Sequence, residues 1–119
     1  MTTANADLNS ILPLSPATFH ILLSLADQQR HGYSIMQDIA ERTNGEIAMG
    51  PGTLYGAIKR LRKQGLIEEI NAPLNSTSDD ERRRYYRLTS FGQKVGQAEA
   101  ERLAQLVRQA QAKQLLPQL

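Results

Sequence analysis

The feature of this 119-residue chain that most constrains its fold is a change of sequence period near its middle. Up to about residue 65, apolar side chains recur at the three- and four-residue spacing of amphipathic helices. Leu66–Ile70 and Arg84–Leu88 instead have the β-favouring and aromatic composition of short strands. The polar segment 71–83 separates them, as expected for a hairpin loop. The pattern therefore predicts helices followed by a hairpin, within a single domain.

Three short helices are predicted before the hairpin. They cover residues 16–27, residues 32–43, and a segment from Pro51 or Thr53 to Gly65. Ser15 before a proline is a helix-start signal, and Asn44-Gly45 favours a left-handed exit from the second helix. Three helices followed by a hairpin predict a mainly α protein with a small β-hairpin (α+β), built as a winged helix-turn-helix domain.

A fourth, longer helix is predicted after the hairpin. Ser90 and Gln93 match a capping box, the pattern continues to about Leu115, and Pro117 ends it. At 1.5 Å per residue, about 26 residues make a rod of roughly 39 Å, which is longer than a domain of this size covers. We therefore expect a homodimer, formed through an interrupted apolar stripe that comprises Phe91, Val95, Leu103, Leu106, Val107 and Ala110. The stripe is compatible with plain packing and, less readily, with an effector pocket.

The third helix has the construction of a helix that reads DNA. Pro51 suits its first position, and the glycines on either side allow close backbone approach to another surface. Lys59, Arg60, Arg62 and Lys63 lie away from the apolar positions Leu54, Ile58 and Leu61. A solvated basic face would show the same pattern.

Charge is distributed unevenly along the chain, whose formal net charge is +2. The balance is −3 over residues 1–50, +3 over residues 51–88, and +2 from residue 89 onward. Basic side chains therefore collect in the third helix and the hairpin, which is consistent with a polyanionic partner such as nucleic acid.

Several side chains are predicted to contact DNA, and each has an alternative role. On the third helix they are Gly52, Thr53, Tyr55, Lys59, Arg60 and Lys63; at the start of the second helix, His31 and Tyr33; and in the wing, Arg82, Arg83 and Arg84. Tyr55 also fits packing against the second helix, and His31 and Tyr33 also fit buttressing of the turn. The wing arginines also fit pairing with Asp79, Asp80 and Glu81.

Other classes of function find little support in the sequence. The chain has no cysteine, and His20 has no partner at metal-ligand spacing, so neither a metal nor a cofactor is predicted. It offers no glycine-rich phosphate loop and no nucleophile paired with a base, so an enzyme is not expected. It also lacks a signal-peptide run and an apolar segment of about 20 residues, and we expect a cytoplasmic protein without contact to membranes.

Four motifs together resemble the PadR family of bacterial transcriptional regulators. They are His31-Gly32-Tyr33, Pro51-Gly52-Thr53-Leu54-Tyr55, Leu61 with Gly65-Leu66-Ile67, and Tyr85-Tyr86-Arg87-Leu88-Thr89. The resemblance covers about residues 14–92, and the short remainder is similar to the subgroup with one C-terminal dimerisation helix. It implies an arm over 1–13, a winged helix-turn-helix DNA-binding domain over 14–88 and a dimerisation helix over 89–119.

The family resemblance also implies a mechanism. The protein is expected to be a dimeric repressor that binds double-stranded DNA at an inverted repeat and is released by a small effector at the dimer interface. The chain departs from many members because acidic and arginine residues at 79–84 replace a Gly-Arg-Pro step, and because it has no tryptophan to stack on flat drugs. The alternative is a winged-helix protein-interaction module without specific DNA binding.

Overall fold

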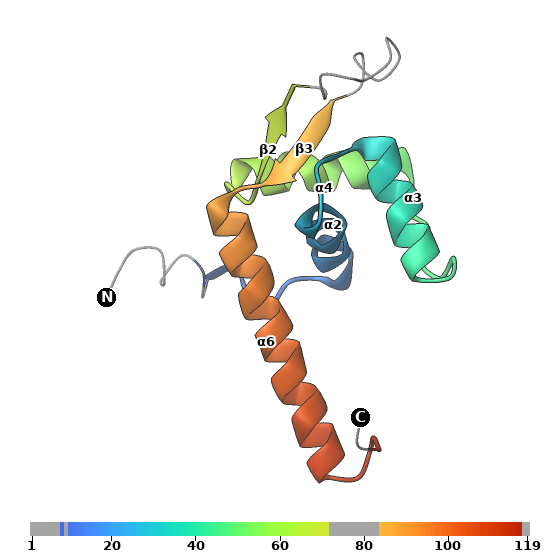
Figure 1. The fold of residues 1–119 in the computed structure, drawn as a ribbon, viewed down its shortest axis with the longest axis vertical. Helices are drawn as coiled ribbons and strands as arrows, with labels where there is room; N and C mark the ends of the chain where they lie inside the picture. Colours follow the sequence, from blue (N-terminus) through green and yellow to red (C-terminus); the bar gives the residue numbers. More distant parts are fainter. Residues whose placement is uncertain (1–7, 9, 72–83, 118–119) are drawn as a thin grey trace.

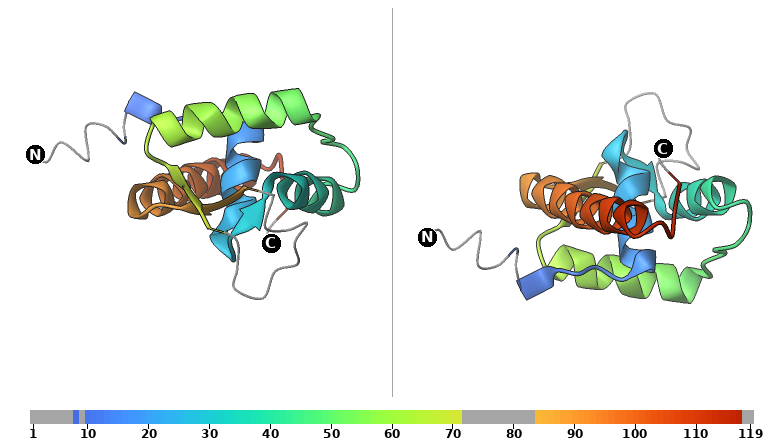
Figure 2. Two further views of the ribbon diagram at one scale, coloured as in Figure 1. Left: turned by 90° about the horizontal axis from the view of Figure 1, so that it is seen from above. Right: turned by 90° about the horizontal axis from the view of Figure 1, so that it is seen from below.

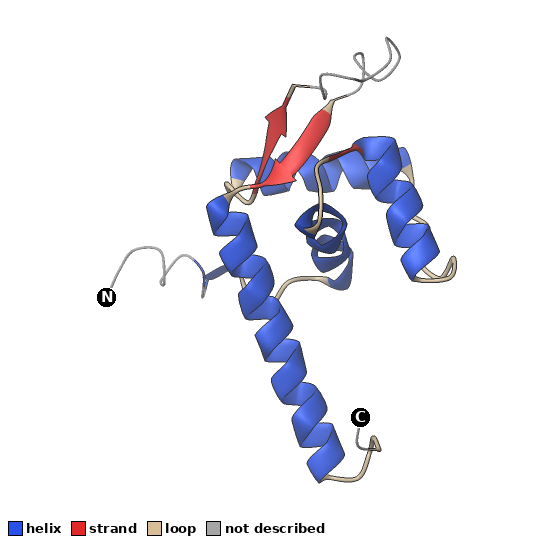
Figure 3. Ribbon diagram, in the orientation of Figure 1, coloured by secondary structure: helices blue, strands red, loops and turns tan. Residues whose placement is uncertain are grey.

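The computed structural model describes residue 8, residues 10–71 and residues 84–117. Within these residues it confirms a mainly α fold with a small antiparallel sheet (Figures 1 and 3). The elements are α2 (Pro16–Ala26), β1 (Arg30–His31), α3 (Gly32–Arg42), α4 (Pro51–Lys63), β2 (Ile67–Ile70), β3 (Tyr85–Leu88) and α6 (Ser90–Ala112).

Local signals set the ends of the first three helices. Ser15 caps α2, and its side-chain oxygen accepts a hydrogen bond from the Thr18 N–H at 3.1 Å. Asn44 and Gly45 leave α3 with φ angles of 52° and 80°, and Gly65 follows α4 with φ 78°. Glycine adopts this left-handed conformation without steric cost, which explains why the predicted ends were close to the observed ones.

The helices pack around one hydrophobic core. In Figure 1, α2 lies at the centre with α3 on one side and α6 on the other, and Figure 2 shows α4 along one outer side. The core combines the apolar faces of all four helices with Leu66, Ile67 and Tyr86 from the sheet region. Burying each large aliphatic side chain contributes about 1.5–3 kcal/mol, so the relative orientation of α3 and α4 is strongly determined.

The sheet contains a strand that the sequence pattern did not predict. Its order is β1-β3-β2, and both neighbouring pairs are antiparallel. Two-residue β1 pairs Arg30 with Tyr86 and His31 with Tyr85. A strand of two residues is too short to show an alternating pattern, because alternation needs about four positions.

The paired tyrosines of β3 are both buried, which differs in part from expectation. Successive side chains of a strand point to opposite faces of the sheet, so one tyrosine is expected to pack on the core and the other to support the wing or the last helix. Tyr86 is 2% exposed and belongs to the core, whereas Tyr85 is 8% exposed. The Tyr85 ring meets the His31 ring edge to face, with centroids 5.2 Å apart. His31 belongs to strand β1, which the sequence pattern did not predict.

The start of α6 requires a correction. Thr89, not Ser90, is the N-cap, and its side-chain oxygen accepts a hydrogen bond from the Gly92 N–H at 3.0 Å. The Thr89 hydroxyl also donates to the Gly65 carbonyl, which ties this helix start to the end of α4. A Cβ at Gly92 would overlap the Leu66 carbonyl oxygen, so the first turn of α6 approaches the backbone closely. Both contacts join residues that are distant in sequence, so the local capping pattern does not predict them.

A buried carboxylate anchors the middle of α6. Glu99 is 2% exposed, and Arg102 donates to both of its oxygens at 2.8 and 2.7 Å. The Leu14 N–H lies 3.4 Å from the same carboxylate, which joins α6 to the segment before α2. The hydrogen bonds from Arg102 lower the pKa of Glu99, so the carboxylate stays ionised. Beyond this point α6 extends away from the other elements (Figure 1).

Candidate nucleic-acid interface

α4 divides into a buried face and an exposed face. Leu54, Ala57, Ile58 and Leu61 are buried in the core. The structure leaves exposed all the α4 residues that the sequence predicted to contact DNA: Gly52, Thr53, Tyr55, Lys59, Arg60 and Lys63. Packing therefore orients the helix so that hydroxyl, aromatic and basic groups gather on one accessible surface.

The first turn of α4 is bare and polar. Gly50 is the N-cap and has no side chain with which to satisfy the first N–H groups. No described atom lies within 4 Å of a Cβ built at Gly52, so this turn is open to a ligand surface. The N-terminal end of a helix carries a partial positive charge, which favours phosphate groups. Arg60, Arg62 and Lys63 in the last turn extend the positive potential along the helix.

Tyr55 joins α4 to the start of α3. A Cβ built at Gly32 would fall on the Tyr55 hydroxyl oxygen, so the tyrosine tip lies against the α3 backbone. Tyr55 is nevertheless 46% exposed. The predicted packing against the second helix is therefore confirmed, and the exposed part of the ring lies on the same side of α4 as Lys59, four residues later.

Replacing Gly32 by alanine should disturb this junction. The new methyl group would displace the Tyr55 ring, and we expect a loss of about 1–3 kcal/mol in the free energy of unfolding, as for other overpacked sites. DNA affinity should fall as well, because Tyr55 moves. Urea denaturation measures the first effect and duplex titration the second.

Gly96→Ala provides the matched control. No described atom lies within 4 Å of a Cβ at Gly96, which is inside α6. Alanine should therefore stabilise this helix by up to about 1 kcal/mol. Equal stabilisation by both substitutions would show that Gly32 is not required for the Tyr55 contact.

His31 has a structural role at the start of α3. Its Nδ1 accepts a hydrogen bond from the Ser34 N–H at 3.1 Å, and its side chain caps the helix. The predicted buttressing of the turn is therefore confirmed for His31. Tyr33, two residues later, is more than half exposed beside the same turn. A DNA contact by either residue stays a prediction.

Two arginines that sequence analysis did not single out hold α3 against α2. Arg42 donates to the Asp38 carboxylate at 2.8 Å, to the Ser24 hydroxyl at 2.9 Å and to the His20 carbonyl at 3.0 Å. Arg30 donates to the Ser24 carbonyl at 2.7 Å and lies 3.5 Å from Asp38. The Arg42–Asp38 pair has the local i,i+4 spacing of a helix, whereas the contacts with α2 join residues up to 22 positions apart and have no local sequence signal. They fix α3, and through it the position of α4.

Partial burial of His20 beside Arg42 makes the stability of the fold depend on pH. Partial burial, followed by the nearby Arg42 cation, lowers the pKa of His20 below its usual 6.5. The unfolded chain then binds a proton at pH values where the folded chain does not, so stability is lost as pH falls below about 6.5. We expect His20→Gln to flatten the dependence of unfolding free energy on pH between 7 and 5. Identical pH profiles for both proteins would contradict this assignment.

Described residues at the base of the wing form ion pairs that the sequence pattern did not predict. Arg84, just before β3, lies 3.4 Å from Glu69 on β2. Arg62 on α4 lies 3.7 Å from the same carboxylate. The sequence also allows Arg84 to pair with Asp79, Asp80 or Glu81, but these residues, like Arg82 and Arg83, lie outside the described residues. The sequence pattern did not identify Glu69 as the partner of these two arginines.

The residues of the predicted dimerisation stripe fall into two groups, one that packs in the core of the chain and one further along α6. Val95 is 0% exposed and belongs to the core of its own chain, so its assignment to a partner-facing surface is wrong. Phe91 is half-buried and packs on the same core. The distal positions differ: Leu103, Val107 and Ala110 are half-buried and Leu106 is 49% exposed. The first turns of α6 therefore complete the domain, and the later turns keep an apolar row.

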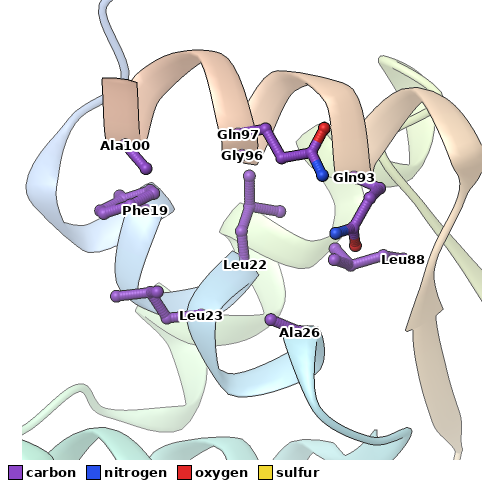
Figure 4. Close-up of a pocket in the computed structure, with 9 residues that line it drawn as sticks. All are labelled: Phe19, Leu22, Leu23, Ala26, Leu88, Gln93, Gly96, Gln97 and Ala100. Atoms are coloured by element: carbon purple, nitrogen blue, oxygen red, sulfur yellow. The ribbon is translucent and has the colours of Figure 1, made fainter. Parts of the chain in front are cut away.

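A small pocket lies between α2 and α6 (Figure 4). Its volume is about 160 Å³, and its lining is Phe19, Leu22, Leu23, Ala26, Leu88, Gln93, Gly96, Gln97 and Ala100. The floor is aliphatic and aromatic, and two glutamine side chains lie on the α6 side. Such a lining suits a small apolar group with one or two hydrogen-bonding atoms.

The arrangement of α3, α4 and the sheet, with a basic exposed face on α4, defines a winged-helix DNA-binding protein. The model of the transcriptional regulator PadR-like family matches residues 21–98. The chain belongs to this family, which consists of transcription regulators and not of enzymes.

Individual relatives agree with the family assignment. Uncharacterized protein X of Lysinibacillus sphaericus is 40% identical over 72 residues, which are 60% of this chain and 63% of the relative. A transcriptional regulator from Clostridium thermocellum is 28% identical with a TM-score of 0.65, over 81% of this chain and 89% of that one. A PadR family transcription regulator from Clostridium difficile, 24% identical, has the same fold with a TM-score of 0.68, over 86% and 100% of the two chains.

The described part of the chain has neither a membrane-spanning helix nor a metal-binding cluster. None of its helices combines the length and the apolar composition needed to cross a bilayer. No group of three or more histidine, cysteine or acidic side chains in this part is placed to hold a metal ion.

Proposed function

We propose that a homodimer of this chain binds an inverted repeat in double-stranded DNA and represses transcription in the cytoplasm. The exposed face of α4 carries the proposal, because its glycines, hydroxyls and basic side chains are held outward by four buried apolar residues. In a winged-helix protein this helix enters the major groove and the wing contacts flanking backbone. Thr53, Tyr55 and Lys59 are our first choices for base-edge or phosphate contacts.

The distal half of α6 supports the dimer. Leu103, Leu106, Val107 and Ala110 recur at three- and four-residue spacing, and this row continues past the point where the domain covers the helix. A two-fold pairing of these rows would bury them and would relate the two α4 helices by symmetry. To read two half-sites, the helices must lie about one helical turn, roughly 34 Å, apart.

We further propose that a small apolar effector releases the DNA. The pocket between α2 and α6 supports this proposal because it joins the α6 dimer element to the first helix of the DNA-binding unit. An occupant that changes the angle of α6 would change the separation of the two α4 helices. Affinities for effector and DNA would then be coupled reciprocally.

Titration of labelled duplex DNA with the purified protein at several salt concentrations tests this function. Binding through phosphates releases counterions, so the logarithm of affinity should fall linearly with the logarithm of salt concentration. An inverted-repeat duplex selected by the protein should bind more tightly than a scrambled one. Absence of binding at low salt would contradict the proposal and favour a protein-interaction role for the same surface.

A further inference from the structure

Glu69 places a negative charge within the basic surface of the proposed DNA-binding unit. It lies on β2 opposite Tyr86 of β3, and alternation along the strands puts both side chains on the same face as Arg84. One carboxylate oxygen lies 3.7 Å from Arg62 Nη2, and the other lies 3.4 Å from Arg84 Nε. A single carboxylate thus joins the last turn of α4 to the base of the wing.

The buried Tyr86 side chain supports this placement. Burial, then the Glu69 carboxylate and Tyr55, raise the pKa of Tyr86, while Arg84 and Arg62 act in the opposite direction. Glu69 is the register partner of Tyr86 and lies within ion-pair distance of both arginines, so these groups gather beside one tyrosine. Arg62 lies three residues from Lys59 and is therefore its neighbour on the helix surface. The paired arginines are solvent-exposed and remain within reach of an approaching polyanion.

We propose that Glu69 acts as an internal competitor for phosphate and thereby sets the sequence specificity of the protein. Its carboxylate occupies Arg62 and Arg84, which would otherwise bind the DNA backbone, and it repels phosphate directly. This inference rests on the proposed DNA-binding function. Phosphate contacts carry no sequence information, so restraining two of them lowers affinity for all DNA and leaves discrimination to base contacts.

The proposal makes a quantitative prediction for salt dependence. Each additional phosphate contact steepens the slope of log affinity against log salt by about 0.9. Glu69→Gln removes the charge while nearly preserving shape. We expect this variant to bind scrambled duplex about three- to tenfold more tightly at low salt, with a slope steeper by about 1–2. The ratio of affinities for selected and scrambled DNA should fall.

Glu68→Gln is the matched control. It makes the same change in formal charge one residue away, but Glu68 lies on the opposite face of the sheet and pairs with Arg87 at 2.6 Å. We expect little change in its salt slope. Equal tightening by both variants would mean that net charge alone acts, and would overturn the role of Glu69. Weaker binding by Glu69→Gln would overturn it too, because the carboxylate would then position the arginines productively.

Combining Glu69→Gln with Arg62→Gln separates the possible failures. If freed Arg62 makes the new phosphate contact, the double variant should lose about half of the added slope, whereas Arg62→Gln alone should change the slope little. If the slope of the double variant equals that of Glu69→Gln, Arg62 makes no contribution to the added phosphate contact. If wild type and Glu69→Gln both fail to bind any duplex, the proposed function itself fails. Binding by wild type without tightening by Glu69→Gln rejects the competitor role alone.

Discussion

Lys59→Glu is expected to reduce affinity for the selected inverted repeat by about 100-fold or more. Lys59 is exposed on α4 and lies four residues after Tyr55, so the two side chains are neighbours on the helix surface. Loss of one good contact costs about 1–3 kcal/mol, and the new carboxylate would also repel phosphate in both half-sites. Fluorescence anisotropy with labelled duplex at a fixed salt concentration measures the effect.

Lys94→Glu is the control for net charge. Lys94 is exposed on α6, and its reversal changes the formal charge by the same amount. We expect a several-fold loss at most, because the effect of a charge outside the interface is screened by salt over about 10 Å. Equal losses for the two reversals would show that α4 has no special position on DNA.

Leu106→Glu is expected to dissociate the proposed homodimer. Leu106 is 49% exposed in the isolated chain and belongs to the distal apolar row of α6. Two-fold symmetry would place two carboxylates in the interface, where burial of unpaired charge costs several kcal/mol. We expect a monomer at micromolar concentration, and binding to the inverted repeat weakened by about 100-fold or more because the two half-sites no longer act together.

Analytical ultracentrifugation of Leu106→Glu should be compared with Gln105→Glu. Gln105 is the exposed neighbour of Leu106, and its substitution adds the same charge beside the row rather than within it. The control should remain dimeric. A dimer that withstands Leu106→Glu would move the interface elsewhere, for example to the exposed Leu23 on α2.

Sequence reasoning succeeded where structure depends on neighbouring residues. The bounds of α2, α3 and α4 were predicted within one or two residues, because Ser15, Pro51 and Gly65 act on the turns beside them. The exposed face of α4 was predicted because burial of Leu54, Ile58 and Leu61 leaves the basic positions outside. These features rest on local capping signals and on helical periodicity.

Contacts between distant residues could not be predicted in the same way. Strand β1 exists because β3 pairs with it across about 55 residues, and Thr89 replaces Ser90 as a cap while it contacts Gly65. Val95 has the spacing of the dimer stripe, yet tertiary packing places it in the core. The pairing of Glu69 with Arg62 and Arg84 likewise depends on how the sheet meets α4.

The most direct test of sequence-specific DNA binding is selection from sheared genomic DNA by the purified protein, followed by footprinting of the enriched fragments. Wild type and Lys94→Glu should protect two symmetric half-sites with centres about one helical turn apart. Lys59→Glu should protect neither. Enrichment of the same fragments by Lys59→Glu, or no enrichment by wild type at low salt, would contradict recognition of DNA by α4.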